Sequence, residues 1–320
     1  MTLRGPFFEG GYRPQFSGHE TFPLRYGWLK KAFDAVYASE KSKDNKSVFS
    51  GDEAIADFGV GRNMALSMRH WASAAGIIED KPNSNTLRVT DLGRKIFGPR
   101  GKDPFIEHPT TLWLIHWQLS GKPERTTWYW SFNHYPALTF DREHLAKGLE
   151  KLASSQNWSR VATSTIKRDV ECFVRTYAAY PTEQGSARED DLESPLTELG
   201  LIKAVGKRDS FRFVRGAKAN LSDGVFVYAL IDFWARHSTA RTLAFEKLAY
   251  EPGSPGRVFL LDENDLADRL MRIDEISDGA FRWSETSGLK QIIREVEFGE
   301  EEALGYVERD YRADSDAEAA

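Results

Sequence analysis

The residues best suited to chemistry lie near the start of the sequence, between positions 16 and 30. His19 and Glu20 are adjacent there, and Arg25 follows five residues later. An imidazole and a carboxylate can transfer protons in a reaction, so His19 and Glu20 are the candidate catalytic residues. The alternative is structural: the pair caps the helix that follows and ties the N-terminal segment to the core.

The sequence after His19 predicts an amphipathic helix. Thr21 is placed to be its N-cap, and Pro23 fits the first turn. Apolar residues then recur at steps of three and four, which extends the helix to about Tyr37. Because a helix start presents unpaired N–H donors, the turn that carries His19 is a candidate phosphate site.

Residues 48–98 follow the plan of a winged helix. Ser50 and Glu53 have the spacing of a capping box, which predicts a short helix to Phe58. A glycine turn and a longer helix over 62–75 follow, and Gly76 is placed to end that second helix. Residues 77–90 then read as a hairpin or wing, and residues 91–97 as a closing helical turn.

The helix over 62–75 has two distinct faces. Its apolar side is expected to pack in the core and consists of Met64, Ala65, Met68, Trp71, Ala72 and Ala75. The opposite side carries Arg62, Asn63, Leu66, Arg69, His70 and Ser73. Arginine and asparagine are the side chains that read guanine and adenine edges, so this face is a candidate DNA contact. The alternative is a solvated face on a protein–protein module.

Further cations extend the candidate DNA surface. The wing supplies Arg88, with Arg94 and Lys95 behind it. A second amphipathic helix is predicted over 163–177, and its outward side carries Lys167, Arg168 and Arg175. We expect these residues to contact DNA phosphates, together with Arg25.

The remaining segments complete the expected domain organisation. Residues 1–47 form an N-terminal motif and helix, and residues 99–138 an aromatic helical core whose tryptophans either pack inside or stack on bases. Residues 139–216 form a second winged-helix-like domain, since Thr197-Glu198-Leu199-Gly200 echoes Thr90-Asp91-Leu92-Gly93. Residues 217–299 form a C-terminal helical domain that ends in a helix over 289–296, and residues 300–320 a frayed acidic tail. The fold class expected is mainly α with small β wings (α+β): tandem winged-helix or helix-turn-helix units around the aromatic core.

Composition and charge narrow the protein class. The 320 residues are 41% hydrophobic and 28% charged, and no apolar run is long enough for a membrane span or a signal peptide. The single Cys172 excludes an internal disulfide, so a cytoplasmic location is expected. The net charge of −5 divides into +4 over residues 1–100 and −11 over residues 261–320. Such asymmetry is a feature of nucleic-acid-binding proteins with acidic tails, although an acidic tail also promotes solubility.

Several cofactor motifs are absent from the sequence. There is no Gly-Lys-Ser/Thr phosphate loop, GxGxxG, HExxH or GxSxG pattern, so no nucleotide or flavin cofactor is expected. The spacing of His108, His116 and His134 is too irregular for a metal motif. A metal-dependent nuclease needs only two or three carboxylates, so Mg²⁺ or Mn²⁺ is the candidate cofactor.

Three segments resemble a bacterial family of unknown function whose members are encoded beside DNA phosphorothioation genes. The first segment comprises residues 16–22, Arg25 and residues 28–30. The second is residues 194–202, and the third is residues 283–289. The family includes SspB, a component of Ssp systems described as a DNA nickase. The resemblance implies a DNA-binding, phage-defence protein that nicks one strand of double-stranded DNA so that sulfur can be incorporated. It implies as partners a cysteine desulfurase, an ATPase and a sulfur-activating protein, and a homodimer is a candidate assembly. The alternative function is a non-catalytic winged-helix DNA-binding subunit or transcriptional regulator.

Overall fold

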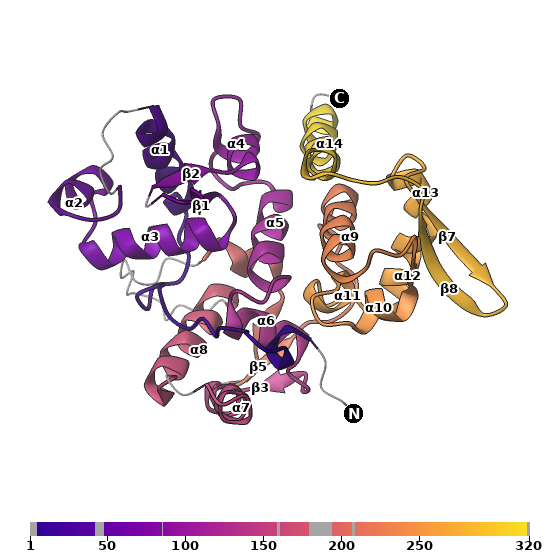
Figure 1. Ribbon diagram of the computed structural model, residues 1–320, viewed down its shortest axis with the longest axis horizontal. Coiled ribbons are helices and arrows are strands. Elements are labelled where there is room, and N and C mark those ends of the chain that lie inside the picture. Colours follow the sequence, from indigo (N-terminus) through magenta and orange to yellow (C-terminus); the bar gives the residue numbers. More distant parts are fainter. Residues whose placement is uncertain are drawn as a thin grey trace.

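The chain folds as an α+β protein in which helices predominate over short strands (Figure 1). The computed structural model describes residues 5–41, 48–84, 86–158, 161–178, 194–206 and 209–318. The described strands form one two-stranded and two three-stranded antiparallel sheets. The expected class, mainly α with small β elements, is therefore confirmed. No helix in the described part of the chain combines the length and the apolar character that a membrane span requires.

The first long helix, α1 (Trp28–Lys41), begins later than the sequence pattern predicts. Thr21 has a φ of 69°, so it is not an N-cap, and the proline that follows lies outside the helix. The carbonyl of Phe22 instead accepts hydrogen bonds from the indole of Trp71 and the thiol of Cys172. These contacts hold the segment in an irregular conformation and delay the start of the helix.

The next elements follow the predicted order: α2 (Asp52–Phe58), α3 (Arg62–Ala74), the hairpin of β1 (Ile78–Asp80) and β2 (Leu87–Val89), and α4 (Asp91–Phe97). Gly76, with a φ of 68°, stands just after α3 as expected. The N-cap of α2 is Gly51 and not the predicted Ser50, while the side chain of Glu53, the other half of the predicted capping box, lies outside the described residues. With a φ of 91°, Gly51 starts the helix one residue later than a Ser50 cap would require.

The centre of the molecule consists of α5 (Pro109–Ser120) and α6 (Thr126–Asn133). α5 is buried on all sides, and its Trp113 and Trp117 are fully enclosed. Trp128 and Trp130 of α6 are buried as well. These tryptophans are therefore core residues, and the alternative that they stack on bases is wrong for this structure.

The next group of elements packs against α5 and α6. α7 (Arg142–Ser155) and α8 (Thr163–Tyr177) form a helix pair, followed by the 3-10 helix η3 (Pro195–Leu199). The adjoining sheet has the order β3-β5-β4, from β3 (Thr139–Phe140), β5 (Phe211–Phe213) and β4 (Ile202–Ala204). The similar sequences that begin at Thr90 and Thr197 do not occupy equivalent positions in the fold. Thr90 caps a helix that follows its hairpin, whereas Thr197 lies inside η3, which precedes its hairpin.

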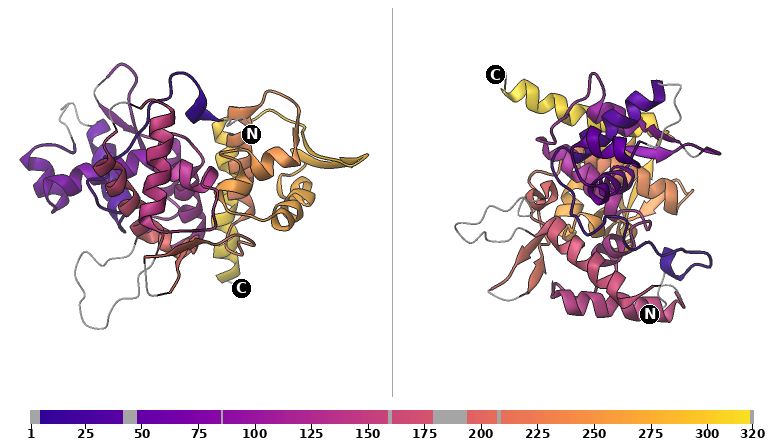
Figure 2. Two further views of the ribbon diagram at one scale, coloured as in Figure 1. Left: turned by 90° about the horizontal axis from the view of Figure 1, so that it is seen from below. Right: turned by 90° about the vertical axis from the view of Figure 1, so that its left-hand side faces the viewer.

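The C-terminal part contains a sheet where the sequence predicted only helices. α9 (Asp223–His237) is a long helix, as expected for a helical domain. β8 (Leu289–Arg294) pairs with β7 (Phe281–Thr286) and with β6 (Thr242–Ala244), so the predicted helix over 289–296 is wrong. The hairpin of β7 and β8 projects from the body of the molecule (Figures 1 and 2). The short helices of this part are α10 (Phe245–Tyr250), α11 (Pro255–Val258), α12 (Glu263–Met271) and α13 (Ile273–Ile276). One further short helix, the 3-10 helix η1 (Pro6–Phe8), lies near the N-terminus.

The sequence predicted a frayed acidic C-terminal segment. In the structure this segment forms the helix α14 (Glu300–Glu318). Four apolar side chains anchor it against α9: Ala303, Leu304, Tyr306 and Val307. Their spacing of one helical turn gives α14 a buried stripe, which the many carboxylates around it concealed in the sequence.

Candidate functional site

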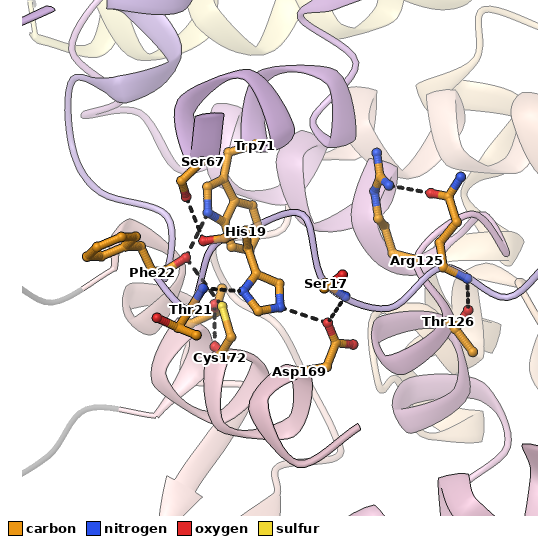
Figure 3. A network of polar contacts seen from close by, with 12 residues as sticks. Ser17, His19, Thr21, Phe22, Ser67, Trp71, Arg125, Thr126, Asp169 and Cys172 are labelled. Carbon is orange, nitrogen blue, oxygen red and sulfur yellow. Dashed lines mark hydrogen bonds and ion pairs between the residues drawn. The ribbon is translucent and has the colours of Figure 1, made fainter. Parts of the chain in front are cut away.

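A polar network joins the N-terminal segment to helices α3 and α8 (Figure 3). His19 is 1% exposed, and its Nε2 lies 2.7 Å from Oδ1 of Asp169 on α8. The backbone N–H of Ser17 donates to the same carboxylate oxygen at 2.8 Å. A residue near the start of the chain is therefore fixed to one 150 positions later.

The hydrogen bonds of His19 define its tautomer. Nδ1 accepts a hydrogen bond from the backbone N–H of Thr21 at 3.0 Å. The proton therefore resides on Nε2, which donates to Asp169. Because both ring nitrogens are engaged, His19 has no nitrogen available to take a proton from a substrate in this arrangement. The geometry favours the structural alternative for His19, although it does not cap α1.

Helix α3 approaches the same segment from the other side. The hydroxyl of Ser67 donates to the carbonyl of His19 at 2.9 Å, and the rings of His19 and His70 lie 5.8 Å apart. Gly18 has a φ of 94°, and a Cβ at this position would lie 2.5 Å from Nδ1 of His70. Only glycine therefore permits this close approach of segment and helix. Burial lowers the pKa of His70 well below its ordinary value, with contributions from the charge of Arg125 and from His19, so His70 is neutral at pH 7.

The network holds a segment with unusual backbone angles. Ser17, Glu20 and Thr21 have φ values of 69°, 48° and 69°. Each such conformation in a non-glycine residue costs roughly 1–3 kcal/mol and persists only when its surroundings impose it. Glu20 is exposed whereas His19 is buried, so the two candidate catalytic residues do not face a common site.

The predicted DNA face of α3 is open to solvent only in part, because His70 on that face packs against Gly18 of the N-terminal segment. Arg62 and Asn63 are exposed at its first turn. Arg69 is exposed too and forms a surface ion pair with Asp80 at 3.3 Å. In the adjacent hairpin, Arg88 pairs with Glu79 at 2.7 Å. Exposed pairs of this kind contribute at most about 1 kcal/mol, so a phosphate can compete for either arginine.

The other predicted contact residues are spread over the surface. Lys167 and Arg168 are exposed on α8. Arg175 is half-buried, and its guanidinium donates to the carbonyl of Thr21 at 3.5 Å. Arg25 lies over the rings of Phe22 and Trp28, 5.6 Å from each centroid. The segment 16–22 thus brings together His19, His70 and Arg175, whereas Arg69 and Arg88 pair with carboxylates of the hairpin of β1 and β2.

Asp169 is a site residue that the sequence prediction omitted. It lies three residues after Ile166 and four before Phe173, both of which are buried. An acidic residue on the apolar face of a helix is the signal that would have identified it. Its second oxygen, Oδ2, is buried and has no hydrogen-bond partner among the described residues.

The described residues do not form a recognisable metal site. No group of three or more His, Cys, Asp or Glu side chains among them could hold a metal ion. Mg²⁺ and Mn²⁺ prefer several carboxylate oxygens, and Asp169 supplies only one carboxylate beside His19. We therefore derive no chemical step through a metal from these residues.

The comparisons with known proteins identify the family. Residues 16–311 match the family described as "Protein of unknown function (DUF4007)". This chain belongs to that family. The prediction from the opening motif is confirmed, because the solved structures that resemble the chain include two of SspB.

The likeness to SspB extends over most of both chains. A magnesium-ion-bound SspB crystal structure superposes with a TM-score of 0.80, and a second SspB crystal structure with a TM-score of 0.81. Each is 28% identical to this chain and covers 94% of it, and the alignment spans 88% of the SspB chain. No curated protein matches the sequence.

Proposed function

We propose that this protein is the double-stranded-DNA-binding component of a bacterial DNA phosphorothioation system. Its likeness to SspB over 94% of the chain supports the link to an Ssp system. The partners we propose are those that the sequence resemblance implies, namely a cysteine desulfurase, an ATPase and a sulfur-activating protein. The proposal includes a cytoplasmic location and a homodimer as the candidate assembly.

The exposed polar face of α3 is the observation that carries DNA binding. Arg62, Asn63 and Arg69 point to solvent from a helix whose back is anchored by the fully buried Met68 and Trp71. A short helix, a glycine turn, a second helix and a hairpin follow one another in residues 48–98, as in a winged helix. We propose that α3 enters the major groove and that the hairpin of β1 and β2 contacts the backbone.

A second unit extends the proposed interface. α7, α8 and the hairpin of β4 and β5 repeat the succession of two helices and a hairpin, which supports a second winged-helix-like unit. Lys167 and Arg168 are exposed on α8 and would contact phosphates, with Arg175 and Arg25 nearer to the segment 16–22.

Duplex binding tests this proposal. The double variant Arg62→Ala with Arg69→Ala should weaken binding about 10- to 100-fold and reduce the slope of log K against log salt by about two. Fluorescence anisotropy of a labelled duplex at several salt concentrations gives both quantities. Lys247→Ala, which removes an exposed cation from α10, is the matched control and should change neither. Binding by the double variant that equals that of the native protein would eliminate α3 as the contact helix.

Nicking of one strand is the finer proposal, and it rests on the family resemblance. The alternative, a non-catalytic DNA-binding subunit or regulator, is favoured by the burial of His19 and the engagement of both its ring nitrogens. Relaxation of supercoiled plasmid by the purified protein with Mg²⁺ or Mn²⁺ separates the two. If the protein is a nickase, the activity that converts supercoiled plasmid to the open-circular form should stay with the protein through successive columns. If it is the non-catalytic alternative, it should bind DNA without relaxing the plasmid.

A further inference from the structure

The fold holds the guanidinium of Arg125 in place, and no carboxylate of the described residues forms an ion pair with it. It is half-buried at the N-cap of α6, and within the described residues no carboxylate lies within 4 Å of it. Its Nε is buried and has no hydrogen-bond partner in the same part of the chain. In Figure 3 its side chain points away from Asp169. Because Nε is enclosed, an anion from outside would meet the terminal nitrogens of the guanidinium.

The surroundings of Arg125 fix its position. Nη1 donates to Oε1 of Gln15 at 2.5 Å, at the surface. Gln15 is itself fixed by two hydrogen bonds to Thr126: its backbone N–H donates to the hydroxyl of Thr126, and its carbonyl accepts from the backbone N–H of Thr126. The guanidinium is thus oriented by a neighbour that carries no charge, so its positive charge stays available for a ligand.

Arg125 lies at the start of the helix that packs against the buried sides of both proposed DNA-contact helices. One turn after it, Trp128 packs against Trp71 of α3 and against Phe173 of α8, with ring centroids 5.6 Å away in both cases. The charge of Arg125 also reaches His70 on α3, where it contributes to the lowered pKa of that imidazole. The charges that oppose an anion near Arg125 are those of Glu124, which is exposed, and Asp169, whose Oδ1 already accepts two hydrogen bonds.

We infer that Arg125, oriented by Gln15, contacts a backbone phosphate of the duplex where it passes from α3 to α8. The inference rests on the proposed DNA binding and adds a contact that joins the two helices. A guanidinium fork matches the oxygens of a phosphodiester and carries no information about base sequence. The residue would therefore position the duplex rather than select its sequence.

The salt dependence of duplex binding tests the inference. Arg125→Gln should reduce the slope of log K against log salt by about 0.9, which corresponds to about a fivefold loss of affinity at 0.15 M salt. Arg125→Lys keeps the charge and should retain the slope. Lys247→Gln, on helix α10, is the control for the loss of any surface cation and should leave slope and affinity unchanged. Thermal melting of each variant establishes that it is folded.

A measurement on the native protein keeps the test decisive if Arg125→Gln does not fold. An arginine-specific dicarbonyl reagent, read out by peptide mass spectrometry, should modify Arg125 less when saturating duplex is present, and should modify the exposed Arg241 equally with and without duplex. Unchanged modification of Arg125, or an unchanged salt slope in folded Arg125→Gln, overturns the inference. If the native protein binds duplex through α3 in those same experiments, the proposed function stands; if the native protein shows no salt-dependent binding, both are wrong.

Discussion

Side chains around His19 hold the strained segment 16–22 in its conformation. Three backbone angles in the left-handed region lie within five residues, at Ser17, Glu20 and Thr21. The carboxylate of Asp169 and the imidazole of His19 take up the backbone N–H groups of Ser17 and Thr21, respectively. The hydrogen bonds of this buried pair therefore offset the conformational cost of the segment.

Removal of His19 should destabilise the protein before it affects any chemistry. His19→Ala leaves the buried carboxylate of Asp169 with only the donor from Ser17, and the loss of one partner of a buried pair costs about 3 kcal/mol. Urea unfolding followed by tryptophan fluorescence measures the change. Glu20→Ala is the matched control, because this neighbour is exposed and its loss should change stability by less than about 0.5 kcal/mol. A His19→Ala variant with native stability but no plasmid nicking would restore the catalytic interpretation of His19.

At the scale of elements, the sequence identified those whose signal is local. The alternation of apolar and polar positions in α3, with a glycine at each end, predicted both the helix and its buried face. The segment 289–296 was predicted as a helix, because a short apolar run is compatible with helix or strand. Its strand state is decided by two pairings. The hairpin with β7 turns at Ser287-Gly288, a local turn signal that the prediction did not use, whereas the pairing with β6, nearly fifty residues earlier, leaves no local pattern.

The candidate site was predicted only in part for the same reason. The sequence singled out His19, but its partner Asp169 is brought to it by tertiary packing of α8 against the segment 16–22. The orientation of Arg125 by Gln15 likewise depends on two segments that are 110 residues apart. The sequence shows which candidate residues lie near one another in the chain, whereas contacts between distant elements are seen only in the structure.

The acidic helix α14 stabilises the start of α9. Asp310 accepts hydrogen bonds from the backbone N–H groups of Gly224 and Val225 at 3.0 and 3.1 Å, and from the hydroxyl of Ser222 at 2.6 Å. A Cβ at Gly224 would lie 2.3 Å from the carbonyl oxygen of Tyr306, so the two helices pack in close contact there. Asp310 thus acts as an N-cap supplied by another helix.

Asp310→Ala should lower stability by about 2 kcal/mol, because it leaves two backbone donors at the start of α9 unpaired in a partly buried site. Differential scanning calorimetry measures the change. Glu301→Ala, an exposed change on the same helix, should have little effect. Equal melting of Asp310→Ala and Glu301→Ala would mean that α14 does not support α9, and that the acidic segment acts only in solubility.

At the scale of the whole molecule, a buried histidine joins three parts of the core. His116 is fully buried in α5, and its Nε2–H donates to the carbonyl of Val258 in α11 at 2.8 Å. Its Nδ1 accepts a hydrogen bond from the hydroxyl of Tyr177 in α8 at 2.8 Å. Burial lowers the pKa of His116 to about 4, partly opposed by the bond to Val258, and burial also lowers the pKa of His134 to about 4. The core is therefore assembled around imidazoles that must stay neutral.

This requirement predicts a loss of stability in mild acid. Below pH 6.5 the unfolded chain binds protons at these histidines and the folded chain does not, so the free energy of unfolding falls as the pH drops from about 6.5 toward 4. For His116 alone the loss is about 1.5 kcal/mol between pH 6.5 and 5, a window in which most carboxylates remain ionised. Urea unfolding at pH 7, 6 and 5 measures the slope, and His116→Gln should flatten it by about one proton even if it lowers stability at every pH. A native protein with the same unfolding free energy at pH 7 and pH 5 would show that these imidazoles take up protons in the folded state, and that the core tolerates their charge.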